Sequence, residues 1–115
     1  MRKEAVPGRN NYDIACLHNI SGDEELAIII SHGFGSSKES PTAVTLMETL
    51  DARGIGAFAY DFPGHGESPV GGEMLRIENC LDDLAAVEGM DPARARDVKE
   101  GLVRLRELNL LERYG

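Results

Sequence analysis

The 115-residue chain has no tryptophan, only two cysteines and no long hydrophobic run. Its longest apolar stretch, LAIIIS at residues 26–31, is far shorter than the roughly 20 residues that a membrane-spanning helix needs. Cys16 and Cys80 stand alone, without the CxxC or Cys/His spacing of a metal site. We therefore expect both to be reduced core thiols of a cytoplasmic protein that holds no metal and no cofactor.

Positive charge is also scarce. The 20 acidic residues outnumber the 12 basic ones and give a formal net charge of −8. Binding to nucleic acid or to an anionic membrane surface needs a basic face, so we expect neither as a partner. The N-terminal segment MRKEAVPGRN is basic, but no apolar region follows it, which is not the pattern of a signal peptide.

Four segments in the first half of the chain have strand patterns. Residues 4–7 and 12–20 predict an N-terminal β-hairpin around the turn PGRNN. Residues 26–31 and 55–62 are apolar on both faces, which is typical of strands in the middle of a parallel sheet. Because helical patterns alternate with these strands, we predict an α/β fold with a mostly parallel sheet.

Two helices are predicted after the apolar strands. Ser40 can cap the first helix, Pro41 suits its first position, and Gly54 can end it. The second helix is expected to end at Gly89. Each helix has one apolar face at helical spacing, formed by Ala43, Leu46, Met47 and Leu50 in the first and by Ile77, Leu81, Leu84 and Val87 in the second.

The composition changes at the segment GMDP. Residues 1–90 hold six basic and fifteen acidic residues, a net charge of −9, whereas residues 91–115 hold six and five, a net charge of +1. Asp91 and Pro92 are typical of a helix start, and an amphipathic stripe follows, made of Val98, Leu102, Leu105 and Leu108. We therefore divide the chain into a domain at 1–90 and a helical tail at 91–115. The segment GLVRLRELNLLERYG also resembles the recognition helix of winged-helix regulators, although the acidic chain disfavours DNA.

The loop SHGFGSS follows the first apolar strand. In an open parallel sheet, functional loops lie beyond the carboxyl ends of the strands. The glycines in His32-Gly33-Phe34-Gly35 allow a tight turn with unpaired backbone N–H groups, which can stabilise a developing oxyanion. The alternative is a strand-to-helix turn in which the glycines serve only the geometry.

A second loop, DFPGHGES at residues 61–68, follows the next apolar strand. Gly64, His65 and Gly66 predict a sharp turn, and Asp61 and Ser68 can hydrogen-bond nearby backbone. His65 is a candidate base, but a histidine between glycines is more often structural. We interpret this loop as a structural turn.

Together, the two loops and the strand–helix–strand pattern resemble the α/β-hydrolase superfamily over residues 4–89. The most similar branch is that of the small cytoplasmic acyl-ester hydrolases and serine-aminopeptidase-like proteins. The resemblance implies that residues 1–90 are the N-terminal half of this fold. It also implies that the backbone N–H of Phe34 is one oxyanion donor and that His32, Gly33 and Gly35 shape that loop. If the site is completed by the missing half, the resemblance implies a small acyl substrate.

The attacking residue of that superfamily is missing. Its nucleophile lies in a G-x-S-x-G motif, followed by an acid and a histidine, but this chain has no such motif and no histidine after His65. None of its serines stands between glycines at that spacing: Ser21, Ser31, Ser36, Ser37, Ser40 and Ser68. A short-range pair of His32 with Ser36 or Ser37 is the remaining alternative. No catalytic residue is therefore assigned.

Three functions remain open on the sequence: a hydrolase relative that is inactive alone, a subunit completed by another chain that supplies the serine, acid and histidine, and a non-catalytic interaction module. In the superfamily's strand order, residues 12–20 pair with residues 55–62, which pair with residues 26–31. That order leaves residues 26–31 at an open edge without charge, so we also expect a homo-oligomer.

Overall fold

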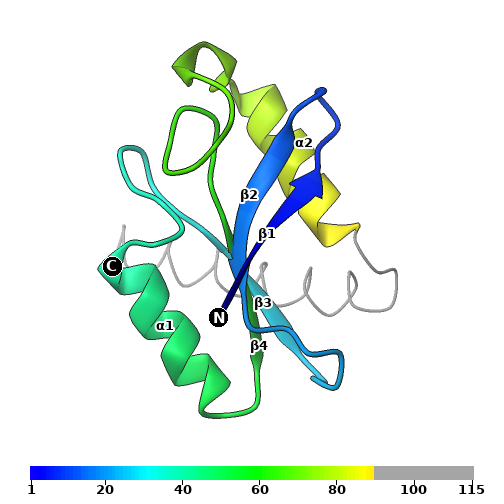
Figure 1. Cartoon of the computed structure of the whole chain (residues 1–115), viewed down its shortest axis with the longest axis vertical. Helices are drawn as coiled ribbons and strands as arrows, with labels where there is room; N and C mark the ends of the chain where they lie inside the picture. Colours follow the sequence, from blue (N-terminus) through cyan, green and yellow to red (C-terminus); the bar gives the residue numbers. More distant parts are fainter. Residues whose placement is uncertain (90–115) are drawn as a thin grey trace, which may run out of the picture.

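The computed structural model describes residues 1–89 (Figure 1). The described part contains a four-stranded sheet with the strand order β1-β2-β4-β3. Its strands are β1 (Arg2–Pro7), β2 (Asp13–His18), β3 (Ala27–Ser31) and β4 (Gly56–Tyr60). Two helices, α1 (Pro41–Asp51) and α2 (Ile77–Glu88), and a short 3-10 turn, η1 (Gly72–Met74), complete it. The predictions for residues 91–115 lie outside the described residues.

The predicted α/β fold, the N-terminal hairpin and the strand order are confirmed. The sheet is mixed, however, and not mostly parallel. β1 pairs with β2 and β2 pairs with β4 in antiparallel fashion, whereas only β3 and β4 run parallel. The physical reason is that the hairpin contributes both antiparallel pairings, while a single strand–helix–strand crossover lies within residues 1–89.

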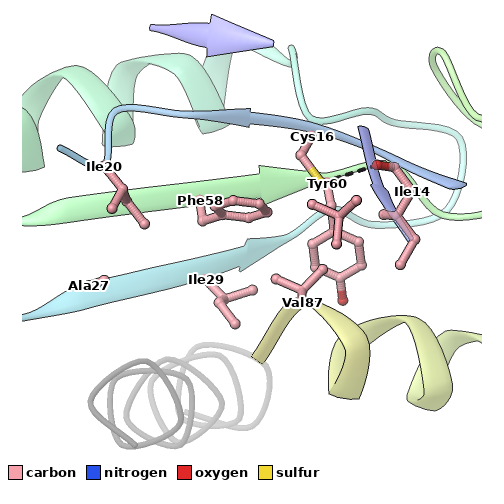
Figure 2. Close-up of a cluster of buried hydrophobic side chains, with 9 residues drawn as sticks. Ile14, Cys16, Ile20, Ala27, Ile29, Phe58, Tyr60 and Val87 are labelled. Carbon is pink, nitrogen blue, oxygen red and sulfur yellow. Dashed lines mark hydrogen bonds between the residues drawn. The ribbon is translucent and has the colours of Figure 1, made fainter. Parts of the chain in front are cut away.

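The core has two layers, one on each face of the sheet. On the α2 side, Ile14, Ile29, Phe58 and Tyr60 pack against Val87 of the helix (Figure 2). On the α1 side, Leu17, Ala57 and Ala59 pack against Met47. All five residues of β4 are buried because alternate side chains face the two layers. β4 is therefore the central strand that its apolar sequence predicts.

Both the start and the end of α1 are as predicted. The Ser40 hydroxyl oxygen accepts a hydrogen bond from the Ala43 N–H at 3.1 Å, and Pro41 is the first helical residue. The last residue of α1 is Asp51, and Gly54, with a φ of +74°, closes the helix. The Gly54 N–H bonds to the Asp51 carbonyl and the Ile55 N–H bonds to the Leu50 carbonyl, both at 3.0 Å, as in a Schellman motif. α2 ends at Gly89 as expected.

Only the second half of α2 uses its apolar face in the core. Val87 is buried and Leu84 is partly buried against the core, whereas Ile77 and Leu81 are 78% and 57% exposed. The expected four-residue apolar face therefore exists, but its first half has nothing to pack against within residues 1–89.

A buried polar contact fixes α2 to the hairpin. The Tyr12 hydroxyl lies 2.9 Å from both carboxylate oxygens of Asp83, which is fully buried. Burial raises the pKa of Asp83, and the hydrogen bond from Tyr12 opposes that rise. Both cysteines are free. Cys16 is a core residue, and burial raises the pKa of its thiol to about 12, whereas Cys80 is partly buried. No helix within residues 1–89 is long and apolar enough to cross a bilayer.

Candidate functional site

The two glycine-rich loops lie at the carboxyl ends of neighbouring strands. β3 leads into residues 32–40, which connect to α1, and β4 leads into residues 61–76, which connect to α2. Because β3 and β4 are parallel and paired from Ala27–Gly56 to Ser31–Tyr60, both loops leave the sheet at the same end. Hydrogen bonds between the two loops show that the loops are in direct contact.

Two histidines connect the loops reciprocally. His32, in the first loop, accepts the Phe62 N–H through Nε2 at 3.1 Å, and His65, in the second loop, accepts the Gly35 N–H through Nε2 at 2.8 Å. Each ring donates through Nδ1 to a local carbonyl oxygen, that of Gly33 at 2.7 Å and that of Pro63 at 3.0 Å. Both imidazoles are therefore neutral Nδ1–H tautomers, and neither has a free nitrogen to act as a base.

A buried ion pair connects the loops a second time. The carboxylate of Asp61 accepts from the backbone N–H and from Nζ of Lys38, at 2.8 and 2.7 Å, and from the Glu67 N–H at 2.9 Å. The side chains of Lys38 and Asp61 are 1% and 0% exposed. Each buried charge therefore has a partner of opposite sign, which is the condition for burying it.

The charges around Lys38 maintain its ammonium form. Burial alone lowers the pKa of Lys38, but hydrogen bonds to Asp61 and Glu67 outweigh burial and raise it. The hydrogen bond from Lys38 in turn lowers the pKa of Glu67 to about 2. Sequence reasoning did not identify Lys38, because its partner Asp61 is 23 residues away and lysine is normally an exposed residue.

Two glycines of the second loop are required by the packing. Gly66 has a φ of +50°, and a Cβ there would lie 2.4 Å from Oδ2 of Asp61. Gly64 has a φ of +77°, and its Cβ would lie 2.7 Å from the Cα of Gly72. The turn that the sequence predicts thus brings the backbone against the Asp61 carboxylate.

The first loop has several backbone N–H groups without a partner within residues 1–89, and that of Phe34 lies beside an aromatic ring. The Ser36 N–H bonds to the Gly33 carbonyl at 3.1 Å, and the Gly35 N–H is bound by His65. The Phe34 N–H, in contrast, makes no hydrogen bond within residues 1–89. The Phe34 side chain is 92% exposed, and its ring contacts His65 edge-on, with 5.6 Å between the centroids. A free N–H on an open loop is the geometry that an oxyanion donor requires.

Within residues 1–89, no serine hydroxyl hydrogen-bonds a histidine. Ser37 accepts from the Glu39 N–H, Ser31 bonds to the Tyr60 hydroxyl, and both nitrogens of His32 are occupied by backbone groups. A pair of His32 with Ser36 or Ser37 is therefore not formed. The remaining histidine, His18, stacks on Phe58 and bonds to Glu4. The described residues thus contain a loop with a free Phe34 N–H and no serine–histidine pair.

Comparison with known proteins places the chain in a family. The family model described as serine aminopeptidase, S33, matches residues 22–101. Mouse α/β hydrolase domain-containing protein 10 superimposes with a TM-score of 0.67 at 17% identity, over 78% of this chain and 35% of that protein. An esterase from Pyrococcus furiosus gives 0.67 at 21% identity, over 85% and 37%. Est1E from Butyrivibrio proteoclasticus, a structure with bound ferulic acid, gives 0.63 at 23% identity, over 73% and 34%.

A separate similarity concerns curated relatives of another kind. The DNA integrity scanning protein DisA of Streptomyces griseus is 50% identical over 44 residues, which are 38% of this chain and 12% of that protein. DisA of Acidothermus cellulolyticus is 62% identical over 34 residues, 30% and 9% respectively. This chain therefore spans only 12% and 9% of these two relatives and about a third of the hydrolase structures.

The family match covers residues 22–101, more than half of the chain, and the superposed structures cover 78% and 85% of it. The chain belongs to the serine aminopeptidase S33 family of α/β hydrolases, and it carries the N-terminal portion of their fold.

Proposed function

We propose that this chain is the oxyanion-loop portion of an acyl ester hydrolase and that it is catalytically inactive alone. The free N–H of Phe34 is the observation that carries the proposal. In acyl transfer, such a donor stabilises the negative charge that develops on the carbonyl oxygen as the nucleophile attacks. The nucleophile itself needs a neighbouring base, and the described residues have no serine–histidine pair.

Purified full-length chain is the direct test of inactivity. We expect no hydrolysis of p-nitrophenyl acetate above background and no covalent labelling by a fluorophosphonate probe, because no hydroxyl is activated. Stoichiometric labelling of a serine would contradict the proposal and would identify that serine by peptide mass.

If a second polypeptide completes the site, it must supply a serine, an acid and a histidine, and the substrate is a small acyl ester. The open edge of β3, which has no partner strand within residues 1–89, is the place where such a segment would extend the sheet. In an active complex, Phe34→Pro removes the backbone donor and should lower kcat by about 10²–10³-fold. Phe34→Ala keeps the N–H and is the matched control. Equal activity of the two variants would show that the loop is only structural.

The alternative within the same fold is a non-catalytic module that associates through the β3 edge, either with a second copy or with another protein. An uncharged edge strand favours such pairing. A completing segment that restores hydrolysis would exclude this alternative, whereas self-association without any activity would favour it.

The similarity to DisA supports a second candidate function, the binding of DNA. The 50% identity over 44 residues is far higher than the identity to any hydrolase structure named above. Because the chain has a net charge of −8, we expect any DNA affinity to be weak and to fall steeply with salt. Fluorescence anisotropy of a labelled duplex at low and physiological salt tests this candidate. No change in anisotropy at about 100 µM protein and low salt would exclude it, since non-specific binders reach Kd values of about 10⁻⁴–10⁻⁶ M.

A further inference from the structure

We propose that His65 is a positioning residue of the oxyanion loop: it binds the Gly35 N–H and thereby fixes the adjacent Phe34 N–H as the free donor. The inference rests on the proposed function, since it assigns a role within that loop. It starts from how little else connects residues 32–37 to the rest of the protein. Within residues 1–89, the only hydrogen bonds from this segment to the second loop are those made by His32 and His65.

His65 is held as an acceptor by its own loop. Its Nδ1 donates to the Pro63 carbonyl at 3.0 Å, so the lone pair lies on Nε2, 2.8 Å from the Gly35 nitrogen. A neighbouring contact supports the same orientation, because the His65 ring lies 4.9 Å from His32 and 5.6 Å from Phe34 between centroids. The ring is thus fixed from its own loop and presents a single acceptor to the other loop.

The contact matters because Gly35 has little else to restrain it. Gly35 has a φ of +79°, and a Cβ there would meet nothing within 4 Å. The next strong anchor along the chain is the buried Lys38. Binding the Gly35 N–H fixes the peptide plane that follows the Phe34 Cα, and so limits the rotation of Phe34 itself. It also occupies the N–H that follows Phe34, while the Phe34 N–H itself stays unpaired within residues 1–89.

The hydrogen bond can be observed in the wild-type chain without any activity. In uniformly ¹⁵N-labelled full-length protein, at a pH where imidazole is neutral, we expect a scalar coupling across the hydrogen bond between the Gly35 amide nitrogen and Nε2 of His65. We also expect the ¹⁵N shifts of His65 to report the Nδ1–H tautomer. Absence of this coupling, or an Nε2–H tautomer, would overturn the proposal.

Two variants separate positioning from general stability. His65→Leu removes the acceptor, whereas His65→Gln keeps a side-chain oxygen that can accept the Gly35 N–H. We expect the order parameter of the Phe34 N–H to fall from about 0.85 to below about 0.6 in His65→Leu and to recover in His65→Gln, while the Phe58 amide in β4 stays rigid. An unchanged Phe34 order parameter in His65→Leu would contradict the role. If His65→Leu does not fold, the scalar coupling in the wild type and the Phe34 order parameter in His65→Gln still test the positioning role.

Failure of this inference can be distinguished from failure of the proposed function. Ester hydrolysis by the chain alone would contradict the proposed function but would leave the coupling intact. A missing coupling in an inactive chain would contradict the positioning role alone.

Discussion

Two regions of the domain differ in how far their groups are satisfied by contacts within residues 1–89. These are the loop end of the sheet and the apolar surfaces. At the loop end, buried charges and imidazoles all have partners: Lys38 with Asp61, and both histidines with backbone groups. Elsewhere, the β3 edge has no partner strand within residues 1–89, and Ile77 and Leu81 are 78% and 57% exposed. Within residues 1–89, the polar groups of the loop end are paired, whereas the apolar side chains of α2 and the β3 edge are partly uncovered.

This difference follows from the range over which each interaction acts. The two loops leave neighbouring strands, so their polar groups can satisfy one another within about 40 residues of chain. A strand edge and an apolar helix face need another strand and another layer to cover them. Exposed apolar surface of this kind marks a place for further protein. The loop end is therefore internally bonded, whereas the β3 edge and the first half of α2 are uncovered within residues 1–89, and we propose that these surfaces bind further protein.

Removing the Asp61 carboxylate should have the largest effect on the loop end. Asp61→Ala leaves the Lys38 ammonium without its buried partner and removes the acceptor for two backbone N–H groups. We expect a loss of about 3–5 kcal/mol in the free energy of unfolding, measured by urea denaturation. The control is Asp23→Ala, an exposed residue without a hydrogen bond in residues 1–89, which should change stability by less than about 0.5 kcal/mol. Equal effects would show that the ion pair does not hold the loops together.

A methyl group at Gly66 should have the next largest effect. Gly66→Ala places Cβ about where the Asp61 carboxylate lies, 2.4 Å from Oδ2, at a φ of +50°. We expect a loss of about 1–3 kcal/mol in thermal or chemical unfolding. Gly72→Ala is the matched control because nothing lies within 4 Å of its Cβ. If both variants were equally stable, the close packing at the second loop would be wrong.

A charged residue on the β3 edge tests whether this edge mediates self-association. The chain should self-associate through β3, and Ile28→Lys should weaken that association at least about tenfold in sedimentation, because pairing would desolvate the ammonium. Ile28 is half-buried and suits this test, whereas Ile29, at 1% exposure, belongs to the core. Ile77→Lys on α2 is the control and should leave strand pairing unchanged. A wild-type chain that is monomeric at tens of micromolar would contradict the expectation.

The smallest expected effect concerns the turn before β3. The Glu24 carboxylate accepts from the N–H and hydroxyl of Ser21 and from the Gly22 N–H, and the Ser21 backbone bond is the main reason that its pKa is lowered to about 2. An unfolded glutamate titrates near about 4.3. This contribution to stability is thus fully present above that value and is lost as the pH falls toward 2.

The stability difference between wild type and Glu24→Gln should accordingly shrink between about pH 5 and pH 2 in urea titrations. Glu25→Gln, at an exposed position without a hydrogen bond in residues 1–89, provides the baseline. Burial raises the pKa of Asp83, which acts in the opposite direction, but wild type and variants share it. A difference that does not change with pH would rule out the turn contact.

The sequence predicted the elements better than it predicted their environments. The Ser40 cap and the buried β4 follow from local chemistry and from an apolar run, and the strand order follows from the family resemblance. The contact between Lys38 and Asp61 was missed because it joins residues that lie far apart in the chain. Ile77 and Leu81 were expected on an apolar face, but helical spacing shows only which side chains share a face. Whether something covers that face depends on the rest of the fold.

Amide hydrogen exchange of the full-length wild-type chain tests the central claim most directly, namely a rigid loop framework with a free backbone donor at Phe34. The Lys38 and Glu67 N–H groups, both bound to Asp61, should be protected, while the Phe34 N–H should exchange at least about 100-fold faster than either. Exchange of Lys38 and Glu67 as fast as that of Phe34 would contradict a prebuilt framework. Protection of Phe34 equal to theirs would show that its N–H already has a partner and cannot serve an oxyanion.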